Sequence, residues 1–389
     1  MWRLIFQVVP VGAWIIAFIT VVRPLELSRR GKFAASALFA LALGKFAFFA
    51  IVGGDEFTPN LAPAVILGYG WIYASVMLLL SLTFPFDILC YLLGLAKIRV
   101  SVRTTRGAFA AFAIVAAAFS AWGIYEGVRT PDVNRIEIEY DDLPQSFDGY
   151  RIVHLSDLHC SSSARRPRFE RIVERVNALD ADLIAMTGDF VDGRVKDRLV
   201  DMEPLAKLRA RDGVWGCAGN HELYWEWDAW SEAFAKMGVR FLDASSESTD
   251  SVIRRGEDAI AIGGLNDSVF SWGTGLVRDA RHAFCSVTND AFRILLFHRP
   301  YTEAIGSEKA DVKLQLSGHT HGGAMPGVKW LVARYNEGHV RGLYEFAKGR
   351  YLHVSPGTGQ WAGFPLRLFN PAEITEITLR RKAAGGSER

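Results

Sequence analysis

The chain has 389 residues, 50% of them hydrophobic, and its 44 Lys and Arg residues nearly balance its 42 Asp and Glu residues. This length suggests two or three domains. A net charge of +2 without long basic runs argues against a nucleic-acid-binding protein, so no nucleic-acid partner is expected.

The first 130 residues contain four apolar runs, each of about the 20 residues that an α-helix needs to span a bilayer. We therefore predict an all-α transmembrane domain of about four helices over residues 1–130. A cleaved signal peptide fits less well because further runs follow the first. The runs are Leu4–Val22, Phe33–Val52, Leu61 to about Leu82, and Ala108–Val128.

The charges between these runs predict an orientation. Basic residues gather in the first and third connections, whereas the second holds Asp55 and Glu56, so the first and third connections are predicted to be cytoplasmic. The chain is then a multi-pass protein of the inner or plasma membrane, with everything after Val128 extracytoplasmic. One more span in the apolar tail after Pro85 would reverse the orientation of everything that follows it. The basic residues are Arg23, Arg29, Arg30 and Lys32, then Lys97, Arg99, Arg103 and Arg106.

Lys45 interrupts the second apolar run, and Asp87 lies in the apolar tail after Pro85. A charge inside a membrane segment suggests a functional site. We favour a structural interpretation, because Lys45 can extend its charged end to the surface and Asp87 lies near an expected interface.

From residue 131 to 380 the composition becomes that of a soluble α/β domain, and residues 381–389 are expected to form a disordered tail. Helices are predicted at Phe169–Leu179, Glu203–Arg211, Asp228–Met237 and Tyr301–Gly306. Strands are predicted at Ile136–Tyr140, Val239–Leu242, Ser251–Arg254, Ala259–Gly263, Tyr351–Val354 and Glu373–Leu379.

Five further apolar segments each end on side chains that bind metals. Since ligands bind at the carboxyl ends of strands in open α/β sheets, these ends predict one shared metal site. The segments are Arg151–Ser156 before Asp157 and His159, Leu183–Gly188 before Asp189, Val214–Gly219 before Asn220 and His221, Ile294–Phe297 before His298, and Leu314–Gly318 before His319 and His321.

The spacing of these residues supports a site for more than one ion. In an extended segment residues i and i+2 share a side, so Asp157 and His159 can bind one ion together. Carboxylate, imidazole and amide oxygen ligands suit Mn, Fe, Zn or Ni. Without His221, seven candidate ligands remain, which exceed the need of one ion, so two divalent metal ions are expected as cofactors. Gly-Asn-His-Glu and Gly-His-Thr-His-Gly-Gly are the specific motifs, whereas a lone Gly-Asp is weak.

In this order, the motifs Asp-x-His, Gly-Asp, Gly-Asn-His-Glu, His and Gly-His-x-His resemble the calcineurin-like metallophosphoesterase superfamily, over about residues 141–379. The stretches Leu155–His159 and Gly188–Asp192 resemble its membrane-associated bacterial branch. The resemblance implies an α/β fold, a four-layer α/β/β/α sandwich, and a metal-dependent phosphoric ester hydrolase. Ala324 departs from the pattern, because relatives often carry Gln there, which leaves the local substrate contact open.

The resemblance also implies roles for single residues. Asp157, His159, Asp189 and His321 would hold one ion, and Asp189 would bridge to a second ion held by Asn220, His298 and His319. A hydroxide that bridges the ions would attack the phosphorus. His221 would be the catalytic histidine that protonates the leaving oxygen, or alternatively a brace for a ligand. Glu222 would orient His221 or its loop, and Arg299 would meet a substrate phosphate or form a surface ion pair.

The sequence thus predicts a membrane-anchored dinuclear-metal phosphohydrolase. Its position beside membrane lipid suggests a phosphodiester or lipid-linked phosphate as the substrate, and soluble phosphate esters are a second possibility. The alternative from another class is a regulatory phosphoesterase module of a membrane sensor or transporter. The sequence does not indicate an oligomeric state.

Overall fold

The chain divides into two compact units in the computed structural model. The helical unit comprises Met1–Gly127 with Ala362–Leu368, and the sandwich unit comprises Val128–Trp361 with Phe369–Arg389. The predicted domain limits at residues 130 and 380 stay predictions. The structure describes residues 2–242, 251–267, 279–285, 287, 290–323 and 329–383.

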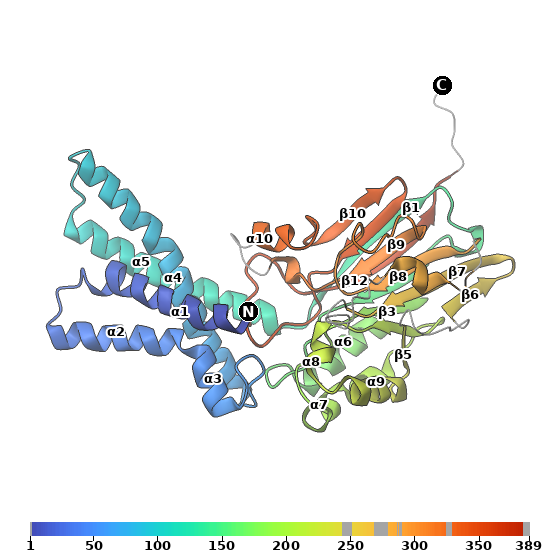
Figure 1. The fold of residues 1–389 in the computed structure, drawn as a ribbon, viewed down its shortest axis with the longest axis horizontal. Coiled ribbons are helices and arrows are strands. Elements are labelled where there is room, and N and C mark those ends of the chain that lie inside the picture. Colours follow the sequence, from blue (N-terminus) through green and yellow to red (C-terminus); the bar gives the residue numbers. More distant parts are fainter. Residues whose placement is uncertain are drawn as a thin grey trace. The chain divides into compact units, whose positions relative to one another are not determined.

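The described part of the helical unit contains the helices predicted from the apolar runs (Figure 1). Two of them, α4 and α5, are each long and apolar enough to cross a membrane, and α2 with α3 qualifies only as a pair bent by 62°. The count of four spans therefore stays a prediction. The apolar tail after Pro85 continues α4 and does not form a separate helix. The helices are α1 (Trp2–Ala17), α2 (Arg29–Leu43), α3 (Lys45–Gly53), α4 (Pro63–Leu95) and α5 (Val102–Val128).

A segment from far along the chain, Ala362–Leu368, packs inside the helical unit. Glycines in α4 and α5 make room for it: a Cβ on Gly70 would lie 2.8 Å from Cγ of Pro365, and a Cβ on Gly123 would lie 2.6 Å from Cδ1 of Leu366. The carbonyl of Gly123 also accepts a hydrogen bond from the backbone N–H of Arg367 at 3.0 Å. The sequence reasoning placed this segment in the soluble domain and did not foresee its contacts with helices.

Lys45 anchors the same segment. Its side chain is fully buried, and Nζ donates a hydrogen bond to the carbonyl oxygen of Gly363. The rings of Phe46, Phe49 and Tyr73 lie 4.2, 5.1 and 5.3 Å from Nζ, which allows cation–π attraction. Lys45 therefore makes an internal packing contact and does not extend to the surface as we expected.

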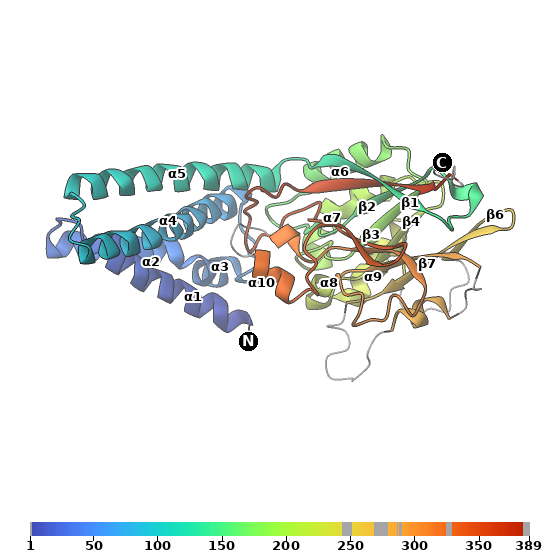
Figure 2. The same ribbon diagram turned by 90° about the horizontal axis from the view of Figure 1, so that it is seen from above.

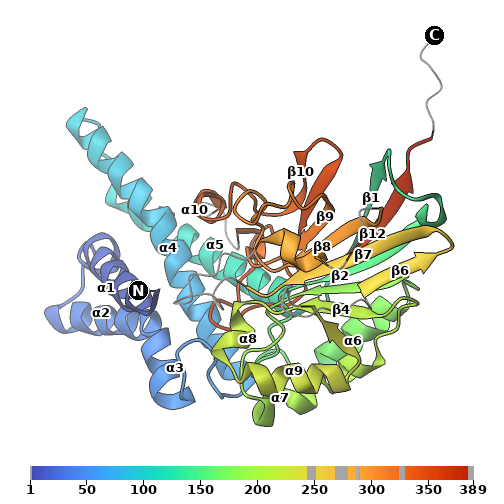
Figure 3. The ribbon, with the colours of Figure 1, turned by 45° about the vertical axis from the view of Figure 1, so that its right-hand side comes forward.

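The sandwich unit is built on two six-stranded sheets (Figures 1 and 3). β1 pairs in parallel with β12, and Figure 2 shows these two strands side by side. The first sheet has the order β1 (Asp132–Tyr140), β12 (Glu373–Arg381), β2 (Tyr150–Leu155), β3 (Leu183–Thr187), β4 (Val214–Cys217), β5 (Val239–Phe241). The second has the order β10 (Gly342–Ala347), β11 (Arg350–Val354), β9 (Val312–Ser317), β8 (Phe292–Phe297), β7 (Asp258–Leu265), β6 (Val252–Arg255).

Three apolar cores hold the layers together. Helices α6 (Arg166–Asn177) and α9 (Trp227–Lys236) cover the outer face of the first sheet with buried residues such as Phe169 and Trp230 (Figure 3). The second core lies between the sheets, and the third lies on the far face of the second sheet beneath the 3-10 helix Ala280–Phe284. The predicted α/β class and layered sandwich are confirmed. Among the described residues, the fourth layer consists of this 3-10 helix and turns.

Most predicted elements of the sandwich unit occur where expected, with three differences. No α-helix forms over the predicted range Glu203–Arg211. Helix α7 (Val195–Met202) ends directly before it and Glu203–Lys207 forms a 3-10 helix, because Pro204 has no backbone N–H to continue the α-helical hydrogen bonds. Residues 301–306 form turns and not a helix. Strand β10 and the short helices α8 (Asn220–Tyr224) and α10 (Lys329–Arg334) were not predicted. Of the expected disordered tail, residues 384–389 lie outside the described residues.

Replacing Lys45 by Met should lower the stability of the helical unit by about 1–3 kcal/mol, because the buried Gly363 carbonyl loses its donor. The matched control is Lys32→Met, since Nζ of Lys32 also donates to a carbonyl, that of Arg23 at 2.7 Å, but in an exposed position. Thermal unfolding of the purified chain in detergent measures both. Equal melting temperatures for the two variants would contradict the role of Lys45.

Candidate metal centre

The predicted ligands follow strands whose carboxyl ends meet. β2, β3 and β4 are neighbouring parallel strands of the first sheet, and β8 and β9 are neighbouring parallel strands of the second. Parallel strands end at the same edge of a sheet, so each side chain that follows such a strand reaches that edge. The structure accordingly brings the predicted Asp and His ligands together in three overlapping groups, one of which, His159, Asp189 and His221, also contains the predicted catalytic histidine.

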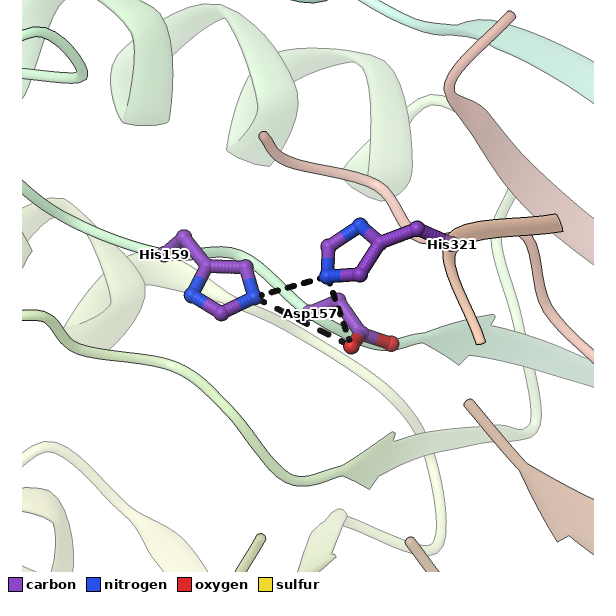
Figure 4. Close-up of side chains that lie close together, drawn as sticks. All are labelled: Asp157, His159 and His321. Atoms are coloured by element: carbon purple, nitrogen blue, oxygen red, sulfur yellow. Dashed lines mark hydrogen bonds and ion pairs between the residues drawn. The ribbon is translucent and has the colours of Figure 1, made fainter. Parts of the chain in front are cut away.

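The first group contains Asp157, His159 and His321 (Figure 4). The Nε2 atoms of the two histidines lie 3.1 Å apart, and Oδ1 of Asp157 lies 3.9 Å from Nε2 of His159 and 3.5 Å from Nε2 of His321. Three donor atoms that converge at these distances leave room for one ion between them. Asp157 and His159 are fully buried, which keeps competing water away from them.

The second group contains Asp189, His298 and His319. Nε2 of His298 lies 3.1 Å from Oδ2 of Asp189 and 3.3 Å from Nδ1 of His319. The opposite nitrogens are occupied by protein: Nδ1 of His298 donates to the carbonyl of Thr187 at 2.6 Å, and Nη1 of Arg299 donates to Nε2 of His319 at 3.1 Å. The protein partners therefore orient the free nitrogens towards the carboxylate.

Asp189 lies within reach of both groups. Its Oδ1 accepts the backbone N–H of His221 at 2.8 Å, whereas Oδ2 is 3.1 Å from His298 and 3.9 Å from Nε2 of His159. A carboxylate in this position is the arrangement that a bridge between two ions requires.

Asn220 begins helix α8 (Asn220–Tyr224), and its amide oxygen provides a test of whether the residues fit a metal. Its Oδ1 is buried and has no hydrogen-bond partner in the described part of the chain. A buried acceptor without a donor costs free energy unless something else binds it. An ion beside this oxygen would satisfy it, so the donor set fits a divalent metal.

The charges of the site also fit cations. Burial opposes ionisation of Asp189, but the imidazoles of His298 and His221 hold the pKa of this carboxyl well below its usual range. Burial alone would lower the pKa of His298, yet the carboxylates, chiefly Asp189, raise it to about 10. Protons and metal ions therefore compete for the same nitrogens, as in other histidine metal sites.

Asp192 holds His221 in place, and the sequence reasoning did not assign it a role. Its Oδ1 lies 2.5 Å from Nδ1 of His221, and its Oδ2 lies 3.1 Å from Nδ1 of His159. Nε2 of His221 remains on the side of the cluster, 3.9 Å from Oδ2 of Asp189. Asp192 is the third residue after Asp189 in Gly-Asp-Phe-Val-Asp, but this local pattern does not show which histidines it contacts.

Glu222 orients the loop that carries Asp189. Its carboxylate accepts the backbone N–H of Asp189 at 2.9 Å, of Phe190 at 2.6 Å and of Gly219 at 2.8 Å. Of the two roles considered for Glu222, these contacts match the loop and not the ring of His221. Because burial and the nearby Asp189 disfavour its charge, the pKa of Glu222 rises to about 7.

Arg299 forms an ion pair inside the protein and not at its surface. Its Nε donates to Oδ2 of Asp267 at 2.7 Å, and the Asp267 side chain is fully buried. The guanidinium is thereby held against His319. Ala324, whose substrate contact was left open, lies outside the described residues.

Five predicted ligands adopt the left-handed backbone conformation that L-residues seldom take. The φ angles are +52° at Asp157, +46° at His159, +55° at Asp189, +68° at His319 and +47° at His321. Asp157, Asp189 and His319 each lie two residues beyond the end of a strand, and a left-handed residue there turns the chain away from the strand direction. This turn explains how separate strand ends aim their ligands at one place.

A family model described as "Calcineurin-like phosphoesterase" matches residues 150–323. An "Uncharacterized metallophosphoesterase" of Aquifex aeolicus is 30% identical over 251 residues, covering 64% of this chain and 92% of that protein. A "Transmembrane protein with metallophosphoesterase domain" of Danio rerio is 32% identical over 277 residues, covering 69% of this chain. The chain spans 62% of the length of that relative.

A solved structure, a "Putative 5'-Nucleotidase from Staphylococcus aureus in complex with alpha-ketoglutarate", matches over 62% of this chain and 56% of that chain. Its sequence identity is 11% and its TM-score is 0.35, a likeness too weak to support a functional statement.

Gly219→Ala should prevent metal binding, because a Cβ at this position would lie 2.6 Å from the backbone N of Asp189 and would displace its carboxylate. Gly216→Ala is the matched control on the adjoining strand, where the nearest atom would lie at 3.4 Å, an ordinary contact. Metal content after dialysis, measured by mass spectrometry, should fall only in Gly219→Ala. Full metal content in that variant would contradict the placement of Asp189.

Proposed function

The chain belongs to the calcineurin-like phosphoesterase family, and on that premise we propose that it is a membrane-anchored phosphohydrolase that uses two divalent metal ions to cleave phosphoester bonds. The observation that carries the proposal is the position of Asp189 between the two ligand groups. The first ion would be held by Asp157, His159, Asp189 and His321, and the second by Asp189, Asn220, His298 and His319.

Two bound ions would lower the pKa of a water molecule and offset the charge of the phosphate oxygens. The chain's own part is to fix the ligands and to limit the access of bulk water to them. Asn220 can bind an ion only through its oxygen, so its NH₂ group stays available as a donor. Arg299, held by Asp267, is positioned to donate to a phosphate oxygen beside His319.

His221 is the proposed general acid. Nδ1 is occupied by Asp192, which leaves Nε2 as the nitrogen that faces the cluster. Burial disfavours the charged imidazole, but Asp189 and Asp192 raise the pKa of His221 to about 9. A protonated Nε2 can give its proton to the leaving oxygen of the ester. The geometry supports this role better than that of a brace, because Asp192 already orients His159 directly.

The substrate is proposed to be a phosphodiester or a lipid-linked phosphate. Two helices of the same chain are long and apolar enough to cross a membrane, and such spans would keep the catalytic unit near lipid. Aromatic rings flank the proposed acid: the ring centroids of Tyr224 and Trp361 lie 5.4 and 6.1 Å from that of His221. Rings at this distance suit a leaving group with an apolar part.

A regulatory module of a sensor or transporter receives less support. Such a role would draw on ionisable groups in the membrane segments, and Lys45 instead makes a packing contact with Gly363.

Asp189→Asn should abolish hydrolysis of bis(p-nitrophenyl) phosphate by the manganese-loaded chain, and a chelator should do the same. His221→Ala should lower kcat about 100-fold or more while metal content stays at two ions per chain. His282→Ala serves as the control, because His282 is exposed in the 3-10 helix Ala280–Phe284. Loss of metal from His221→Ala would assign His221 to metal binding. Undiminished activity of Asp189→Asn would refute the two-metal site.

The side of the membrane on which the sandwich unit lies depends on helix α5. Lys97 and Arg99 in the connection before α5, with Arg103 and Arg106 in its first turns, should keep that connection in the cytoplasm. Since α5 is a single membrane-length helix, the sandwich unit after it is proposed to be extracytoplasmic, whatever the number of earlier spans.

Alkaline phosphatase fused after Arg389 should therefore be active in intact cells, whereas a fusion after Lys97 should be inactive. Green fluorescent protein at the same two positions should give the reverse pattern. An inactive phosphatase with a fluorescent protein at the C-terminus would place the sandwich unit in the cytoplasm.

A further inference from the structure

The short helix α10 (Lys329–Arg334) presents large apolar side chains to the outside of the sandwich unit. None of its six residues is buried. Trp330 is 69% exposed, Leu331 is 39% exposed, and Tyr335 directly after the helix is 64% exposed. Contiguous exposed apolar side chains of this kind mark an interaction surface more often than chance.

The inner side of this helix is firmly held, so the exposure belongs to an ordered element. Nδ2 of Asn336 donates to the carbonyl of Val332 at 2.8 Å, and Asn336 is 5% exposed. The carboxylate of Glu337 accepts the backbone N–H of Thr302 at 2.8 Å and of Glu303 at 3.0 Å. These contacts fix the base of α10 and leave its aromatic side chains projecting outward.

Helix α10 also lies beside the candidate metal centre. It packs against the turn His321–Gly323, and a Cβ on Gly323 would come within 3.1 Å of Cα of Lys329. His321, at the start of this turn, belongs to the first ligand group. Whatever covers the outer face of α10 therefore comes close to the site of catalysis.

The composition of this patch favours a bilayer as the occupant. Trp and Tyr prefer the interface between headgroups and acyl chains, and Lys and Arg attract anionic lipid headgroups. The patch joins Trp330, Leu331 and Tyr335 to Lys329 and Arg334, while the nearby carboxylate of Glu337 is bound to backbone amides. A stable protein interface buries about 1,200–2,000 Å² in total, which so short a helix does not supply.

We propose that Trp330, Leu331 and Tyr335 insert into the headgroup region of the bilayer that α4 and α5 enter. The same chain supplies both the spans and the patch, so binding is intramolecular and needs little affinity. One consequence rests on the proposed function: the His321 turn would face lipid headgroups, and the substrate class would be a phosphate ester carried by a membrane lipid.

Site-directed spin labelling of the full chain in vesicles tests the proposal. Trp330→Cys and Tyr335→Cys are labelled separately in a chain with Cys90→Ser and Cys285→Ser, since Cys160 and Cys217 are buried. Val200→Cys is the matched control, because Val200 is an apolar residue of α7 that is 57% exposed. Vesicles of phosphatidylcholine with phosphatidylglycerol are compared with vesicles of phosphatidylcholine alone.

The expected result is a several-fold lower collision rate with a water-soluble nickel chelate at positions 330 and 335 than at 200, together with a higher collision rate with oxygen. The difference should be larger in vesicles with phosphatidylglycerol, and Lys329→Glu with Arg334→Glu should reduce it.

Three outcomes would overturn the proposal. Equal nickel accessibility at positions 330, 335 and 200 would place the patch in water. Dipolar broadening that disappears on dilution with unlabelled chain would show that a second copy covers it. Protection from both nickel and oxygen would show a protein contact. The measurement needs no turnover, so its failure is distinguishable from failure of the proposed phosphohydrolase activity.

Discussion

The sandwich unit buries four carboxylates in one place, and the arrangement of the site follows from the need to balance their charge. Asp157 and Glu222 are fully buried, and Asp192 and Asp189 are 1% and 2% exposed. An unbalanced buried charge costs several kcal/mol, so each carboxylate requires a partner. Backbone amides balance Glu222, and two imidazoles balance Asp192. Asp157 and Asp189 face the histidines where cations fit. Glu222 and Asp192 therefore bind groups of the protein itself, whereas the carboxylates of Asp157 and Asp189 are left to bind ions.

The sequence was sufficient to find the ligands, because each lies within four residues of the end of a buried apolar strand and the chemistry of the side chain is evident from its type. Asp192 was not found, because its position depends on pairing between segments distant in the chain. The segment that follows Asp189 is held by an isolated bridge between Cys160 and Val191, which brings Asp192 beneath both His159 and His221. No local pattern of residues encodes such a bridge. The partners of Glu222 were ambiguous for the same reason.

In the helical unit, hydropathy likewise predicts the helices, whereas the bend between two of them and the role of Lys45 depend on contacts in the folded chain. The apolar runs predicted helices, but the bend of 62° between α2 and α3 falls at Gly44, within a run that looks continuous. Lys45 immediately after it meets Gly363, a partner 318 residues away. A lysine inside an apolar run can therefore be part of the packing of a unit, and only its partner distinguishes that role from transport or snorkelling.

The strained backbone of five ligands affects whether the site is retained during evolution. These left-handed residues are Asp157, His159, Asp189, His319 and His321. Each residue in this conformation costs roughly 1 kcal/mol relative to glycine, somewhat less for Asp and His, and a domain has only about 5–15 kcal/mol of net stability. Glycine at any of the five positions would relieve the strain and remove a ligand. A lineage with no use for the chemistry would therefore gain stability by losing the site, and selection for folding alone would erase it.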